Sequence, residues 1–263
     1  MHTPPHAARE RIERLLPDDL PARPRAVAVL DGVLAGRVWT DDPVTPSWAV
    51  VIETADGTVY AGGALSGETL REVFGEAETR SGDLIVGFRG AEHSIRRLLP
   101  PDPYYTGRAI DFTERRAMPD EAQLLTSPLA DGLSLVDLAG ILPRTEWAED
   151  TIHAFRSAEA WDRLGIGRCL VDGDGSVVAR GMAGPRVRGR MEMGVWTRDD
   201  SRRRGFGTLV SLATAVAAEA AGASVWWNTN ADNVGSIGIA RRIGFRRERP
   251  YELVAFRTRN GPT

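Results

Sequence analysis

The sequence contains no lysine, so all 33 residues counted as lysine or arginine are arginines. A Walker-type phosphate loop, a Schiff-base lysine and any lysine nucleophile are therefore excluded. The arginines stand against 36 acidic residues, and the formal net charge is −3. A nucleic-acid-binding protein needs a surplus of positive charge to release counterions, so no nucleic-acid partner is expected. GC-rich codon usage, which favours arginine over lysine, is the simplest explanation of the bias.

Cysteine is almost as scarce. Cys169 is the only one, which excludes an intramolecular disulfide and a multi-cysteine metal site. Because it lies in the apolar run 169–171, we expect it in the core of a strand and not as a nucleophile. The motifs His-Glu-x-x-His, Cys-x-x-Cys and Gly-x-Ser-x-Gly do not occur, so no metal site is expected.

Long apolar runs are missing as well. The longest weakly polar run, 209–218, is too short to cross a bilayer. The first thirty residues have no apolar stretch behind a basic start, so no signal peptide is expected. We therefore expect a cytoplasmic protein without a membrane partner.

The composition is that of an ordinary globular protein, with 42% hydrophobic and 26% charged residues. Residues 116–130 are polar and rich in proline, and we interpret them as a boundary between domains 1–125 and 126–263. The first domain has the predicted order β-β-α-β-α-β, which makes it an α/β domain. Its elements are expected at 47–54, 58–63, a helix capped by Ser66, 83–88, 91–99 and 104–112.

The second half has a clearer pattern of strands and helices. Apolar residues in the strong helix 205–221 recur with helical spacing, and this stripe is expected to pack on a sheet: Leu209, Leu212, Ala213, Val216, Ala217 and Ala220. The remaining elements are expected at 132–138, 146–164 (one helix or two pieces), 167–171, 177–181, 191–197, 224–228, 233–242 and 245–256. The similar order of elements in the two halves leaves open a distant internal duplication.

The most informative segment is 195–208, in which a strand ends, a polar turn follows and a helix opens with Arg-x-x-Gly-x-Gly. The start of a helix presents unpaired backbone N–H groups and a partial positive charge. Glycines there allow the backbone to approach an anion closely. This combination predicts a cradle suited to a pyrophosphate. A Gly-x-Gly alone would be an ordinary loop, and a run of arginines alone a solvated face.

With Arg202, Gly205 and Gly207 in these positions, the sequence resembles the GCN5-related N-acetyltransferase (GNAT) superfamily. A second family element follows, with Asn233 and Ser236 in the pattern Asn-x-x-Ser and a Gly-Phe pair at 244–245. The resemblance implies an α/β (α+β) protein. Its GNAT domain would have a mixed, mostly antiparallel sheet flanked by helices, preceded by a smaller α/β domain that could be a degenerate GNAT-like half. The length is similar to that of a bacterial two-domain subfamily.

The resemblance also implies a binding site for acetyl-CoA. The end of the fourth strand would pair with the pantetheine arm, and the loop amides would hold the pyrophosphate. The helix after the fifth strand would contact the cofactor from the other side. Acceptor or pantetheine would pass the fifth strand at Trp227 and Asn228. The implied cofactor-binding residues are Val195, Trp196, Thr197, Arg202, Arg203, Arg204, Gly205, Phe206, Gly207, Thr208, Asn233 and Ser236.

The catalytic groups follow less directly. Many family members carry a general base on the fourth strand, where Glu192 stands; the alternative is an outward-facing strand glutamate. Many also carry a tyrosine seven residues after the helix asparagine, which protonates the departing thiolate. That position is Ala240 here. Tyr251 could substitute for it as the acid, or it could be an ordinary strand aromatic, with the proton supplied by solvent.

These features predict an acyl-CoA-dependent N-acyltransferase that moves acetyl from acetyl-CoA to a primary amine of a small molecule. The domain 1–125 would shape the acceptor site. Two alternatives remain open: a non-catalytic CoA-binding module or sensor, which the alanine at 240 favours, and a peptide or protein N-terminal acetyltransferase. A homodimer is also left open.

Overall fold

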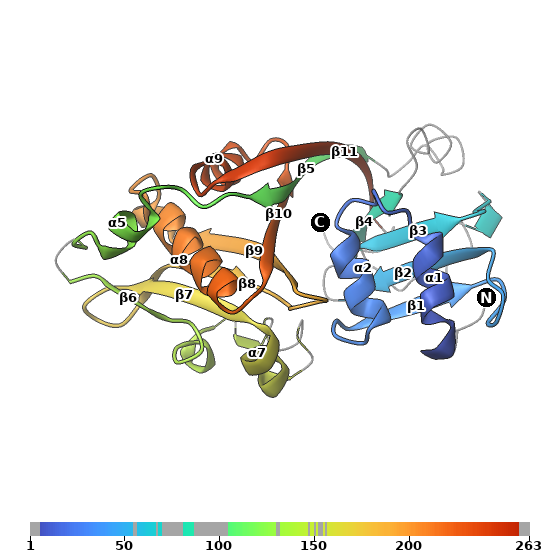
Figure 1. Ribbon diagram of the computed structural model, residues 1–263, viewed down its shortest axis with the longest axis horizontal. Helices are drawn as coiled ribbons and strands as arrows, with labels where there is room; N and C mark the ends of the chain where they lie inside the picture. Colours follow the sequence, from blue (N-terminus) through green and yellow to red (C-terminus); the bar gives the residue numbers. More distant parts are fainter. Residues whose placement is uncertain are drawn as a thin grey trace. The chain divides into compact units, whose positions relative to one another are not determined.

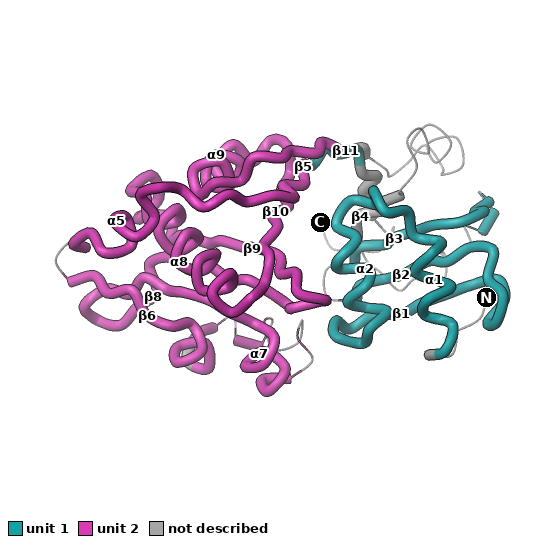
Figure 2. Tube along the Cα trace, in the orientation of Figure 1, with its two compact units in different colours: residues 1–109, 251–263 teal, residues 110–250 magenta. Residues whose placement is uncertain are grey.

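The chain forms two compact units, Met1–Ala109 with Tyr251–Thr263 and Ile110–Pro250, called unit 1 and unit 2 (Figure 2). It passes between them within strands β5 (Tyr105–Arg115) and β11 (Phe245–Arg257). The structure is a computed structural model that describes residues 6–54, 57–66, 68–69, 81–86, 105–129, 132–146, 148–149, 151, 155 and 157–257.

In its described residues, unit 1 contains strands β1 to β4, the end of β11 and helices α1 and α2. Strands β1, β2 and β3 pair antiparallel in chain order, and β4 pairs parallel with β3 and antiparallel with the end of β11. Helices α1 and α2 both contact β2, and every residue of β2 is buried (Figure 1). The elements are α1 (Arg9–Leu15), α2 (Arg23–Leu30), β1 (Gly36–Thr40), β2 (Trp48–Glu53), β3 (Val59–Gly63) and β4 (Ser81–Val86).

Unit 2 contains the larger sheet. Its strands lie in the order β11, β5, β10, β9, β8, β7 and β6. The pairs from β6 to β9 are antiparallel, whereas β9 and β10 are parallel. The strands that complete it are β6 (Ser134–Asp137), β7 (Ile166–Val171), β8 (Val177–Ala183), β9 (Arg190–Thr197) and β10 (Ser224–Asn230). The expected mixed, mostly antiparallel sheet flanked by helices is thus confirmed.

Helices cover both faces of this sheet. Helix α8 (Phe206–Ala220) packs on β7, β8 and β9, with α9 (Val234–Arg242) and α5 (Glu121–Thr126) beside it (Figure 1). Helix α7 (Ala158–Leu164) packs its Trp161 against Cys169 on the other face of β7. Cys169 is buried, as expected, and burial raises the pKa of its thiol to about 11. Within the described residues, no helix has the length and apolarity needed to cross a membrane.

The orientation of α8 differs from the expected one. Leu212 and Ala213 of the expected face are buried, but so are Val210, Ser211 and Thr214. By contrast, Leu209 is only partly buried and Ala220 is exposed. The cause is the glycine at 181 of β8, where an added Cβ would come within 2.6 Å of the backbone oxygen of Val210. The small residues of α8 therefore pack directly on the sheet. The expected stripe, which begins at Leu209, faces partly away from it.

Several other elements were expected differently or not at all. The structure adds α2, β1 and α5, which the proline-rich and polar segments had concealed. Ser66 begins a helix as expected, because its Oγ accepts a hydrogen bond from the N–H of Thr69 at 3.0 Å. The rest of that helix and the helix expected at 91–99 lie outside the described residues.

Candidate active site

Strands β9 and β10 separate toward their C-terminal ends. Their pairing runs from Arg190↔Ser224 to Met193↔Trp227, although β9 continues to Thr197 and β10 to Asn230. Beyond the last pair, the two strands line a single cleft of about 1220 Å³. Helices α8 and α9 supply its other walls, and Leu124 of α5 lies at its edge.

The backbone of β9 offers hydrogen-bonding groups to this cleft. On its other edge β9 pairs with β8, and the N–H of Arg198 donates to the carbonyl of Val178 at 2.9 Å. Because backbone groups alternate in direction along a strand, those of Val195 and Thr197 point toward β10. The cleft is therefore bordered by an open strand edge that can pair with an extended amide-bearing chain.

The start of α8 is open to the cleft. Its N-cap is Gly205, with φ of 84° and no side-chain capping bond. Arg203 also has a positive φ of 62°, so the loop turns twice through the left-handed region. The amides of Phe206, Gly207 and Thr208 precede the first helical hydrogen bonds. Successive N–H groups in such a turn, together with the helix dipole, form an anion-binding concavity.

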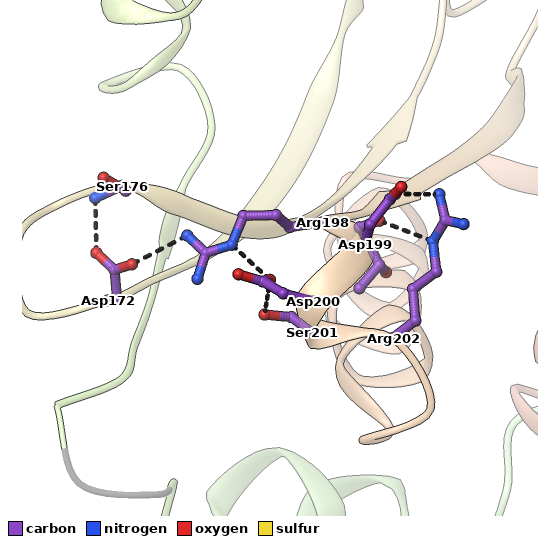
Figure 3. A network of polar contacts seen from close by, with 8 residues as sticks. Asp172, Ser176, Arg198, Asp199, Asp200, Ser201 and Arg202 are labelled. Atoms are coloured by element: carbon purple, nitrogen blue, oxygen red, sulfur yellow. Dashed lines mark hydrogen bonds and ion pairs between the residues drawn. The ribbon is translucent and has the colours of Figure 1, made fainter.

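Two ion-pair systems brace this loop (Figure 3). Arg202 donates from Nη2 to Asp199 at 2.6 Å and from Nε to the carbonyl of Thr197 at 3.3 Å. Arg198 contacts Asp200 at 2.8 Å and, in the turn between β7 and β8, Asp172 at 3.1 Å. The hydrogen bond from Arg198 is the main reason that the pKa of Asp200 lies below its ordinary value.

The side chains of Arg203 and Arg204 have different surroundings from that of Arg202. Arg203 lines the cleft, whereas Arg204 stacks over the ring of Phe206 with its Cζ 4.7 Å from the ring centroid. Arg242 of α9 lines the cleft from the opposite side. Among the described residues that line the cleft, every ionisable side chain is an arginine, which suits the cleft to an anionic ligand.

The Asn-x-x-Ser element has a structural role in the helix itself. The side chain of Asn233 caps α9 by accepting a hydrogen bond from the N–H of Ser236 at 3.0 Å. The Oγ of Ser236 accepts from the Nε1 of Trp227 at 2.9 Å. Both Asn233 and Ser236 line the cleft, so the residues that begin the helix also form its wall.

The two tryptophans of β10 are both buried. Trp227 lies in the core on the helix side of the sheet and reaches the cleft at its edge. Trp226 points to the opposite face. The neighbouring Asn228 lines the cleft, and its Nδ2 donates to the carboxylate of Asp111 in β5. Asp111 is a buried acid, 4% exposed. In the sequence, the only feature that could have pointed to it is an aspartate between the apolar residues Ile110 and Phe112.

The catalytic candidates are distributed differently from the binding residues. Glu192 is half-buried on the face of β9 opposite Met191 and Met193, and it is not among the residues that line the cleft. Tyr251 lies in the part of β11 that belongs to unit 1, and it is not among them either. The sequence also concealed Leu124, which stands in the segment interpreted as a linker.

Position 240, where the family pattern has a tyrosine, lies inside the core. It is fully buried, at 0% exposed, in the core that also contains Phe112 and Phe245. The neighbouring Ile239 of α9 lines the cleft, whereas Ala240 does not. A tyrosine ring at position 240 would therefore enter a filled core, and the departure from the family pattern fits the packing of this chain.

Two splayed parallel strands, an uncapped helix start and an Arg-x-x-Gly-x-Gly loop define a CoA-dependent acyltransferase. The family model for GNAT acetyltransferase matches residues 21–254, which is most of the chain. The chain belongs to this family and is a transferase enzyme. Members of the family use acetyl-CoA as co-substrate, and the open helix start and strand edge fit it. A search of curated proteins by sequence found no match.

Solved structures show the same fold. A GCN5-related N-acetyltransferase-like protein from Streptococcus suis 89/1591 has 18% identity and a TM-score of 0.75, over 94% of this chain and 98% of that one. A tandem GNAT protein from the clavulanic acid biosynthesis pathway has 13% identity and a TM-score of 0.59, over 100% and 98%. A GCN5-related N-acetyltransferase from Kribbella flavida has 18% identity and a TM-score of 0.52, over 90% and 95%.

Proposed function

We propose that this enzyme transfers an acetyl group from acetyl-CoA to a primary amine of a small molecule. The observation that carries the proposal is the cleft between β9 and β10, because it combines an anion cradle with an open strand edge. The same cleft reaches the opposite face of the sheet at Gly194 and Asn228. An acceptor can therefore approach the thioester from the side away from α8.

The co-substrate would lie along the cleft. The amides of 203–208 would hold the pyrophosphate, and Arg202 would add a charge-assisted hydrogen bond. The backbone of Val195 and Thr197 would pair with the pantetheine arm, alongside Trp196. Asn233 and Ser236 would contact it from the wall that α9 forms.

The chemistry needs a neutral amine beside the thioester. The amine nitrogen attacks the thioester carbon, the C–N bond forms, and the C–S bond breaks with release of the CoA thiolate. A backbone N–H of β9 would stabilise the developing oxyanion. Glu192 would take the proton that the amine loses, and Tyr251 or solvent would return one to the thiolate. Both side-chain assignments are proposals from the sequence.

Residues 1–125 would shape the acceptor site, ahead of an acetyltransferase domain at 126–263. The support comes from two residues of this range that belong to unit 2. Leu124 borders the cleft, and Asp111 holds Asn228. The first half of the chain therefore contributes side chains to the surroundings of the cleft in unit 2.

The first test measures CoA binding by calorimetry and acetyl transfer as free thiol released in the presence of tyramine, putrescine, glucosamine or glycine. The variant Gly205→Glu is expected to lose CoA binding, because its carboxylate would stand in the pyrophosphate cradle. Gly205→Ala is the matched control, since a Cβ at this position meets nothing within 4 Å and only the positive φ is penalised. It should bind CoA far better than Gly205→Glu. Near-parent affinity in Gly205→Glu would refute the cofactor site.

A non-catalytic CoA-binding module is the second candidate. Two observations favour it: the alanine at 240, and the absence of any ionisable side chain other than arginine among the described lining residues. Tight CoA binding with no amine-dependent thiol release from any amine or peptide would identify this function. A mass gain on peptides without one on small amines would instead identify a peptide N-terminal acetyltransferase.

A further inference from the structure

A buried carboxylate lies behind the wall of the cleft. Asp111 of β5 accepts a hydrogen bond from the Nδ2 of Asn228 in β10, across 117 residues of sequence. Asp111 is 4% exposed, whereas Asn228 is partly exposed and lines the cleft. An ionised carboxylate in such a place is costly unless hydrogen bonds compensate it, so the pair with Asn228 is a specific feature of the site.

Both side chains face the acceptor side of the sheet. Phe112 and Trp227 belong to the core on the helix side, so their neighbours Asp111 and Asn228 point to the opposite face. Asn228 follows the last pair between β9 and β10, and Gly194 follows it on the partner strand. A Cβ added at Gly194 would meet nothing within 4 Å. Asn228 therefore stands beside open space where the cleft reaches this face.

The carboxylate determines which end of the asparagine faces the cleft. An ionised carboxylate only accepts hydrogen bonds, so it holds the NH₂ group of Asn228 and turns the amide oxygen away from itself. That oxygen has two lone pairs and can accept from a ligand in addition to any protein contact. A neutral primary amine has two N–H groups to donate and one lone pair for attack.

We propose that Asp111 is a positioning residue for the acceptor. It orients the amide of Asn228 so that Oδ1 accepts a hydrogen bond from the amine, which leaves the nitrogen lone pair directed at the thioester carbon. This inference rests on the proposed acetyl transfer and adds a residue that the family signature does not contain. Asp111 acts through Asn228 and does not itself contact the substrate.

The test combines three variants, measured with saturating acetyl-CoA and the most active amine of the four above. Asp111→Ala and Asn228→Ala are each expected to lower kcat/KM for the amine by about 10-fold, the upper end of what the loss of a hydrogen bond between neutral groups causes. Asp111→Asn keeps an acceptor oxygen for Asn228 and should retain activity within about threefold. The double variant with alanine at both positions should be no worse than Asn228→Ala alone. The Kd for CoA should not change in any of them.

Three results would overturn the assignment. A kcat/KM in Asp111→Ala equal to that of the parent would show that Asp111 has no role in positioning the acceptor. Additive losses in the double variant would mean that the carboxylate does not act through Asn228. Equal loss in Asp111→Asn and Asp111→Ala, with loss of the acidic limb of the pH profile, would make Asp111 a base. A parent that releases no thiol with any amine would instead refute the proposed function, and this inference with it.

Discussion

Replacing the two neighbouring aspartates of the cofactor loop should affect CoA binding differently. Asp199 holds the guanidinium of Arg202, and both side chains are largely exposed, at 85% and 60%. A pyrophosphate at the start of α8 must compete with Asp199 for Arg202. Removing the carboxylate in Asp199→Asn ends this competition. An exposed ion pair contributes about 0.2–1 kcal/mol, so CoA should bind roughly 1.4- to 5-fold more tightly.

Asp200→Asn is the matched control, because it removes the same charge one residue away. Asp200 accepts hydrogen bonds from Arg198 at 2.8 Å and from the Oγ of Ser201 at 2.7 Å, and so fixes the loop (Figure 3). Losing these bonds should leave the loop less ordered, and CoA affinity should fall or stay unchanged. A general charge effect would predict equal tightening in both variants, so the comparison separates geometry from net charge.

Calorimetric titration of CoA at about 50 and 200 mM salt measures both effects. The gain in Asp199→Asn should shrink at higher salt, since exposed charges are screened. It should also disappear when Arg202 is replaced by alanine, because there is then no guanidinium to release. Unchanged or weaker binding in Asp199→Asn, or equal tightening by both variants, would refute the competition.

Two further predictions concern stability. The side chain of Arg115 is 1% exposed and pairs with two glutamates. Arg115→Ala should therefore lower the free energy of unfolding by about 3–5 kcal/mol, as the loss of one partner of a buried ion pair does. Arg116→Ala, at a side chain 71% exposed, is the control and should change little in the same urea titration. The pKa of Asp200 is lowered from 3.8, so its contribution is present above about pH 4 and is lost as the pH falls through the lowered value. Arg198→Ala should reduce this acid sensitivity, and equal losses between pH 7 and pH 3 in parent and variant would contradict it.

The features that the sequence predicted correctly are local ones. The strands of the second half and its helices α8 and α9 are specified by short-range periodicity, and Asn233 caps α9 where the motif begins. Of the helix expected at 146–164, the described residues show α7 (Ala158–Leu164) after a break at residues 155 and 157. The uncapped start at Gly205 follows from residues within one turn. Because such features depend on contacts between near neighbours, a pattern of a few residues is enough to predict them.

The orientation of α8 shows where periodicity is insufficient. Two overlapping stripes of its residues have helical spacing, one that begins at Leu209 and one that begins at Val210. The close approach at Gly181 selects the second, because small side chains let the helix reach the sheet. Helix propensity and residue spacing cannot predict which stripe faces the sheet, since this depends on a residue of strand β8.

The sequence by itself determined the family, the anion cradle and the succession of strands and helices. Tertiary structure alone decided that β5, from the first half of the chain, lies between β10 and β11 and brings Asp111 to Asn228. It also placed Ala240, at the position where the family pattern has a tyrosine, inside the core. The physical reason is that backbone hydrogen bonds are the same for every strand. The choice of partner strand therefore depends on long-range packing, which no local pattern records.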